Sequence, residues 1–186
     1  MKPTEILKEE HQLILTMLQV IDAACAKLES GEKVELEHCA DMIDFIRNFA
    51  DRCHHAKEEK LLFPSMEKAG VGRENGPIGV MLAEHTEGRY FAKGMDEALA
   101  EMKTGDSVAT SKFVQDATSY INLLDGHIMK ENNVLFMMAD ERLSAQQQEE
   151  LLKGFDRVER EEIGAGVHEK YHGMLHRLRD IYLADK

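Results

Sequence analysis

Two histidine–glutamate pairs with identical spacing are the residues of this chain best suited to chemistry. His54 and Glu58 stand four residues apart, and a degenerate copy of the surrounding stretch carries His127 and Glu131 at the same spacing. Residues four apart lie on one face of a helix, so both side chains of a pair can reach one small volume. An imidazole and a carboxylate placed in this way are suited to binding a metal ion.

The first copy of the repeat contains two histidines and two glutamates, and the second copy has a counterpart for only one of each. Aligning the two copies pairs His55 with Ile128 and Glu59 with Asn132, so neither residue has a chemical counterpart. Counting along a helix of 3.6 residues per turn also puts His55 and Glu59 on its polar side. We therefore expect these two residues to face water.

Each half of the chain adds one further histidine. Glu10-His11 begins the first half, and Glu84-His85 takes the corresponding place in the second. Each half is then expected to be a helical hairpin, and two hairpins packed about a pseudo-two-fold axis form a four-helix bundle. Four imidazoles and two carboxylates would face its interior: His11, His54, Glu58, His85, His127 and Glu131.

Six polar groups on apolar helix faces require compensation, because unpaired buried carboxylates and imidazoles are costly. Two metal ions supply it, with the two carboxylates bridging the ions and the four imidazoles as terminal ligands. A nitrogen and oxygen ligand set without thiolates fits iron, with manganese or zinc as substitutes. Six side chains do not fill two octahedra, which leaves positions for an oxo or hydroxo bridge and for a small exogenous ligand. The alternative for any single histidine is an ordinary hydrogen-bonded core residue, but the duplicated pattern favours the metal centre.

The composition and the apolar spacing predict an all-α protein with one domain and an appendage. The chain has 186 residues, three prolines and no tryptophan, and its apolar residues recur at spacings of three and four. A chain of this length supports one full hydrophobic core. We expect residues 1–142 to form the bundle, and residues 143–186 to form a C-terminal extension of two helices that packs on it.

Proline, glycine and serine mark where the expected helices begin and end. Pro3 and Pro77 suit first helical positions, Gly31 suits a helix end, and Ser144 begins a capping box. Pro64 could kink the second helix. We expect the second helix to span residues 34–69, the fifth to end near residue 163 and the last to begin at Val167. Asp106 or Ser107 should cap the fourth helix. The apolar stripes also place the side chains of Leu61, Val134 and Ile181 toward the core.

The charge of the chain disfavours nucleic acid and anionic membranes as partners. The formal net charge is -12, and no cluster of Lys and Arg offsets it locally. No apolar signal core follows Met1 and nowhere do about 18 apolar residues run together, so we expect a cytoplasmic protein. Cys25, Cys39 and Cys53 form no Cys-x-x-Cys pair and are expected to be reduced thiols in helices, rather than redox sensors or ligands.

The same residues carry a family resemblance over about residues 1–140. The chain resembles the hemerythrin-like (HHE) cation-binding domain through His11, His85 and its two His-x-x-x-Glu pairs, the first followed by Leu62-Phe63-Pro64. The resemblance implies a non-haem di-iron centre in an up-down-up-down four-helix bundle. It also implies a relation to O2-carrying hemerythrins and to bacterial proteins that handle oxygen, nitric oxide, peroxide or iron.

Two positions depart from the pattern of hemerythrins that carry O2 reversibly. Arg89 stands where they have a second histidine, and Glu131 follows His127 by four residues where they have an aspartate five residues on. Reversible O2 carriage is therefore disfavoured. Arg89 could attract an anionic ligand, with a surface salt bridge as the alternative, and Tyr120 could donate a hydrogen bond, with core packing as the alternative.

We expect a di-iron protein that binds, senses or turns over O2, NO or peroxide at an open iron position. If it is an enzyme, a peroxidase-like, catalase-like or NO-handling activity is expected. Iron storage, iron delivery or repair of iron centres is the alternative, and a metal-free interaction module is a third. His168, His172 and His176 recur every four residues, a spacing that suits either a surface metal site or, as we favour, a solvated helix face.

Overall fold

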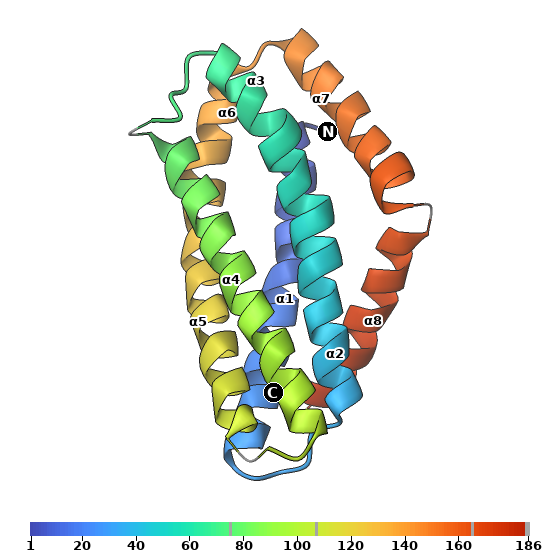
Figure 1. Cartoon of the computed structure of the whole chain (residues 1–186). Coiled ribbons are helices and arrows are strands. Elements are labelled where there is room, and N and C mark those ends of the chain that lie inside the picture. The colour runs from blue at the N-terminus through green and yellow to red at the C-terminus, as the bar shows by residue number, and fades with distance from the viewer. Residues whose placement is uncertain (75, 107, 165, 185–186) are drawn as a thin grey trace.

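The computed structural model describes residues 1–74, 76–106, 108–164 and 166–184, and within these ranges every regular element is a helix. Four long helical segments lie side by side and alternate in direction, which confirms the predicted four-helix bundle (Figure 1). Two more helices, α7 and α8, follow one another along the outside. The elements are α1 Pro3–Glu29, α2 Leu36–Phe45, η1 Ile46–His55, η2 Glu58–Leu62, α3 Phe63–Lys68, α4 Pro77–Lys103, α5 Ala109–Lys130, η3 Glu131–Leu135, α6 Phe136–Arg142, α7 Ala145–Arg157, η4 Val158–Ile163 and α8 Val167–Tyr182.

The helix ends follow the local signals in the sequence. Pro3 and Pro77 are the first residues of α1 and α4, where a missing N–H costs nothing. Gly31 and Gly70 follow helix ends with φ of +77° and +89°, a conformation that favours glycine. Ser144 closes the expected capping box at the start of α7.

The cap of α5 was expected at Asp106 or Ser107. Asp106 Oδ1 accepts a hydrogen bond of 2.8 Å from the backbone N–H of Val108, just before the helix, whereas Ser107 lies outside the described residues. Pro64 is the second residue of α3, where its missing donor is tolerated.

The second and fourth helices of the bundle are not α-helical throughout. Both contain π-helical segments, in which N–H groups bond to the carbonyl five residues back and each turn takes up more residues. One such segment, η2, begins at Glu58, and another, η3, begins at Glu131. The first half has an additional long one, η1, which ends at His55. The duplication therefore extends to the backbone around the two glutamates, with η1 as an asymmetry.

The π-helical segments correct two predicted inward positions. Leu61 is only partly buried and Val134 is 51% exposed, whereas the next residues, Leu62 and Leu135, are fully buried. A wider turn needs one more residue to return to the same face, so the inward stripe moves on by one. The predictions for Leu61 and Val134 were wrong because they assumed 3.6 residues per turn.

The two C-terminal helices cover one side of the bundle. Helix α8 packs against α1 and α2, α7 packs against α1 and η2, and η4 packs against η1. The predicted stripe on α8 is buried at Tyr171, Met174 and Leu178. Its last member was wrong, because Ile181 is 48% exposed and Tyr182 takes the inward place.

Two apolar clusters fill the bundle above and below one polar layer. One cluster includes Leu7, Phe63 and Phe136, and the other includes Ile14 and Phe49. The histidines and glutamates singled out above lie between them, so water is excluded from both ends of the layer. Among the described helices, none has the length and apolar character needed to cross a membrane.

Candidate metal centre

The structure brings all six predicted site residues together in the interior of the bundle. Each is at most 2% exposed. Helix α1 supplies His11, α4 supplies His85, and the two helices that contain π segments supply the rest. Two groups of potential ligand atoms result, with the atoms of each group within 4.8 Å of one another: His11, His54, Glu58 and Glu131 in the first, and His55, Glu58, His85 and His127 in the second.

Each glutamate reaches both groups. Glu131 places Oε2 3.1 Å from His11 Nε2 and Oε1 3.2 Å from His127 Nε2. Glu58 places Oε1 3.6 Å from His54 Nε2 and Oε2 3.4 Å from His85 Nε2. A carboxylate that offers one oxygen to each of two groups has the arrangement of a bridging ligand between two ions.

The histidines of the His-x-x-x-Glu pairs are oriented by glutamates from the preceding helices. His54 Nδ1 lies 2.9 Å from Glu10 Oε2, and His127 Nδ1 lies 2.8 Å from Glu84 Oε2. Glu10 and Glu84 are the residues that precede the two lone histidines, so the repeat places them equivalently. Partners of this kind fix the ring orientation of metal-binding histidines.

The two lone histidines are oriented across the pseudo-two-fold axis. His85 Nδ1 lies 2.7 Å from Glu59 Oε1, and His11 Nδ1 lies 2.9 Å from Asn132 Oδ1. Glu59 and Asn132 occupy equivalent positions in the repeat, so each half orients the lone histidine of the other. Glu59 was expected to face water, and this was wrong, because its side chain is only 27% exposed and is held between His85 and Arg89.

These outward contacts determine which ring nitrogen carries the proton. A carboxylate only accepts, so a neutral ring facing Glu10 or Glu84 carries its proton on Nδ1 and presents a lone pair at Nε2. The Nε2 atoms nevertheless meet in pairs, at 2.9 Å between His11 and His54 and 3.1 Å between His85 and His127. Two lone pairs that face each other at this distance repel unless a proton or a metal ion lies between them. Two nitrogens bound at right angles to one ion would lie about 3 Å apart, so the rings fit metal ions.

The carboxylates lead to the same conclusion. All four carboxylate oxygens of Glu58 and Glu131 are buried, and none has a hydrogen-bond partner among the described residues. Burial, and then the charge of Glu131, raises the pKa of Glu58 well above its usual range. Burial opposes ionisation of Glu131 too, but the neighbouring His127 and His11 outweigh it and hold its pKa well below that range. Buried carboxylates without partners cost several kcal/mol, which cations would offset.

His55 is the residue of the site that the sequence did not reveal. It was expected to face water, but it is 4% exposed and stacks on His85 with ring centroids 3.9 Å apart. Its Nδ1 lies 3.3 Å from Asp51 Oδ1, and its ring belongs to the second group of ligand atoms. The site is therefore less symmetric than predicted, with two histidines in the first group and three in the second.

The π-helical segment η1 explains how His55 comes to face inward. At 3.6 residues per turn, adjacent residues such as His54 and His55 point about 100° apart, and only one faces the core. The wider turn of η1 lets both rings face the bundle interior. The sequence offered one signal for an inward His55, which is Asp51 one turn earlier. Its carboxylate contacts His55 Nδ1, as other side-chain oxygens contact Nδ1 of the other histidines.

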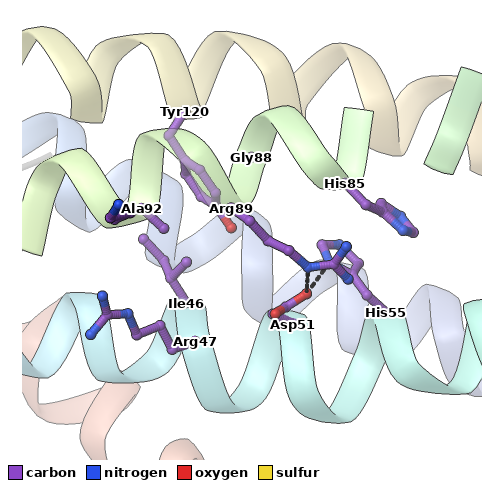
Figure 2. Close-up of a pocket in the computed structure, with 10 residues that line it drawn as sticks. Ile46, Arg47, Asp51, His55, His85, Gly88, Arg89, Ala92 and Tyr120 are labelled. Atoms are coloured by element: carbon purple, nitrogen blue, oxygen red, sulfur yellow. Dashed lines mark hydrogen bonds and ion pairs between the residues drawn. The ribbon is translucent and has the colours of Figure 1, made fainter. Parts of the chain in front are cut away.

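A pocket of about 160 Å³ leads from the surface to the second group. It lies between η1 and α4, with His55 and His85 at one end and Tyr120 from α5 on its wall (Figure 2). Arg89 lines it and donates to Asp51 Oδ1 at 2.8 Å and to Glu59 Oε1 at 2.6 Å. The guanidinium therefore contacts the carboxylates that orient the site and is paired with them. Tyr120 is buried, and burial raises the pKa of its hydroxyl.

The histidines of α8 do not assemble a comparable site. The ring centroids of His168 and His172 are 4.8 Å apart and those of His172 and His176 are 6.2 Å apart. The two groups of ligand atoms already described are those found among the described residues, and neither includes α8. His168 and His172 line a separate hollow of about 330 Å³ beside Glu10 and Glu159.

Comparison with known proteins identifies the family. The hemerythrin HHE cation binding domain matches residues 2–139. The chain belongs to this family. Membership implies a cation-binding site, and the buried histidine and glutamate groups are where this chain could hold one.

The curated relatives are longer proteins. An uncharacterized protein of Mycobacterium tuberculosis is 23% identical over 160 residues, which cover 86% of this chain and 62% of that protein. The iron-sulfur cluster repair protein YtfE of Edwardsiella ictaluri is 32% identical over 138 residues, covering 70% of this chain and 60% of that protein. YtfE of Salmonella newport is 36% identical over 89 residues, covering 46% and 40%. No solved structure matches the chain significantly.

Proposed function

We propose that this chain holds two iron ions in the bundle interior and binds O2, NO or peroxide at an open iron position. The observation that carries the proposal is the convergence of imidazole Nε2 atoms whose Nδ1 atoms are already engaged, around two carboxylates that reach both groups. The ligand set is nitrogen and oxygen without thiolate, which suits iron. Bound iron would supply redox chemistry towards these small molecules.

The residues of the chain would determine how a small ligand reaches the centre. The pocket beside His55 and His85 has room for a ligand of a few atoms, since a water molecule occupies about 30 Å³. Arg89 is paired with Asp51 and Glu59, so its guanidinium is already engaged by two carboxylates. The apolar clusters at both ends of the polar layer exclude bulk water, which leaves this pocket as the favoured route to the second group.

Rapid-mixing spectroscopy tests the proposal. Protein reconstituted anaerobically with two ferrous ions per chain is mixed with O2, NO or hydrogen peroxide. The expected result is a fast change in the absorption spectrum with at least one of them, with both irons retained. Fewer than about one iron per chain after reconstitution would contradict the proposal that the chain binds iron. Iron-loaded protein that reacts with none of the three would contradict the proposal that it binds O2, NO or peroxide.

A second candidate function is repair of iron centres or delivery of iron. The similarity to proteins named for iron-sulfur cluster repair favours it, and the chain spans 60% of the Edwardsiella ictaluri protein and 40% of the Salmonella newport protein. In this case the loaded protein would transfer iron to an apo iron–sulfur protein faster than it loses iron to buffer. Retention of iron in the presence of such an acceptor would exclude it.

A further inference from the structure

A buried lysine connects the first metal group to the C-terminal helices. Lys57 has a fully buried side chain, and its Nζ donates both to Glu10 Oε1 and, at 2.5 Å, to Glu159 Oε1. Glu10 uses its other oxygen to hold His54. A continuous chain of contacts thus runs from Glu159 on η4 through two side chains to an imidazole of the site.

The second half of the bundle has an equivalent lysine–glutamate–histidine connection, but in the part of the chain that the structure describes it lacks an equivalent of the contact with Glu159. Lys130, the repeat equivalent of Lys57, contacts Glu84 Oε1, and Glu84 Oε2 holds His127. The Lys130 side chain is 45% exposed, and the main contacts of α7 and α8 within the described ranges are with helices of the first half. Among the described residues, Lys130 therefore has no contact equivalent to that between Lys57 and Glu159.

Residues of α7 and η4 contact the ammonium group of Lys57. Phe155 on α7 places its ring 5.7 Å from Lys57 Nζ, and Glu159, about one turn later on η4, provides a carboxylate. A buried ammonium with two carboxylate partners is held in one place, whereas an exposed lysine with one partner samples several rotamers. The difference between the halves is thus a difference in how firmly the glutamate behind each histidine is held.

We infer that Glu159 is a positioning residue that fixes His54 through Lys57 and Glu10, so that the C-terminal extension holds the first metal position more firmly than the second. The inference rests on the proposed metal centre. It gives residues 143–186 a role at the site although none of them belongs to either group of ligand atoms.

Release of iron from the full chain tests the inference. Protein loaded with two ferrous ions is mixed with excess of a ferrous chelator, and release is followed by absorbance. We expect Glu159→Ala to accelerate the release of one iron per chain by about tenfold, the lower end of the effect of losing an orienting partner, and Glu159→Gln, which keeps an acceptor, to have a smaller effect. Glu161→Ala, an exposed neighbour on η4, is the matched control and should release iron as the parent does. Equal acceleration for both irons, or none, would overturn the inference.

A second measurement does not depend on iron. In metal-free protein labelled with 15N-histidine, Glu159→Ala should shift the imidazole resonances of His54 and leave those of His127 in place. Unchanged His54 resonances would contradict the positioning role even if the parent protein binds iron normally. If the parent protein takes up no iron, the proposed function fails, whereas these resonances still test whether Glu159 positions His54.

Discussion

The direction of each imidazole is the property on which the centre depends. Every ring in the two groups has an acceptor outside the site at Nδ1, and this leaves Nε2 for the interior. The acceptors come from five different residues, four of them carboxylates, so no single orienting contact is shared. A ligand set arranged in this way is pre-organised before any metal arrives, which lowers the cost of binding.

Glu58 is expected to be the most sensitive single residue, because it belongs to both groups of ligand atoms found among the described residues, whereas Glu131 belongs to the first. Glu58→Ala should reduce reconstituted iron to less than one ion per chain, measured by metal analysis after gel filtration. Glu37→Ala, an exposed acid on α2, keeps the same change in charge and should retain two. Two firmly bound ions in Glu58→Ala would show that it does not bridge.

His55 provides a test of the asymmetry between the groups. His55→Ile introduces the residue that its repeat partner Ile128 carries, so the helix should tolerate it. We expect iron retention at one position to weaken by at least tenfold, as a lost ligand should cost no less than a lost orienting partner. Competition with a graded series of chelators measures the change. Retention equal to that of the parent would place His55 outside the ligand set.

At this scale, the duplication allowed the sequence to predict which side chains lie together. His11 and His85, and the two His-x-x-x-Glu pairs, recur with matching spacing, and the structure buries all of them together. His55 has no counterpart, and its inward direction depends on a backbone form with no strong sequence signal. Glu10, Glu84 and Lys57 orient the site from positions beside recognised residues, but their contacts run between helices and cannot be read from spacing along one.

At the scale of elements, the π-helical segments decide which residues face the core. Helix ends were predictable because Pro3, Gly31, Pro77 and Ser144 act through local backbone chemistry. Two of these segments, η2 and η3, begin at the two glutamates of the site. A strict helical period therefore fails in the turn after each glutamate.

The shifted register predicts unequal effects for two adjacent residues. Leu135→Ala removes a side chain that is 1% exposed and should lower the free energy of unfolding by about 2–5 kcal/mol, whereas Val134→Ala, at 51% exposed, should change it by about 0.5 kcal/mol or less. Urea denaturation of metal-free protein measures both. A larger loss for Val134→Ala would mean that the helix continues in α-helical register.

At the scale of the whole molecule, a nearly symmetric bundle becomes asymmetric at two places. The segment η1 brings a third histidine to the second group, and the C-terminal helices bury the lysine behind the first. The pocket opens beside the second group, on the η1–α4 side. In the proposed metal centre, the first position would be enclosed and firmly held, and the second would lie nearer to an entering ligand.

Acid should remove metal from this arrangement before it unfolds the first hairpin. Burial lowers the pKa of His127, but Glu131 and Glu84 outweigh it and raise that pKa above 6.5, and the pKa of Glu58 is raised above 4.5. Both groups must lose a proton to bind metal, so the affinity for metal falls as the pH drops through their raised pKa values. Glu10 behaves in the opposite sense: burial would raise its pKa, yet His54 and Lys57 lower it to about 2, so its contribution to stability is present above 4.5 and is lost only below.

We therefore expect iron to leave between about pH 6.5 and 5 while the helices persist. Metal analysis after equilibration at each pH, with circular dichroism on the same samples, separates the two events. Because Glu10 and Lys57 remain paired in this range, the helical signal should fall only below about pH 4.5. Full iron content at pH 4 would contradict a ligand set of histidines and glutamates, and simultaneous loss of iron and helix would mean that acid acts by unfolding the bundle.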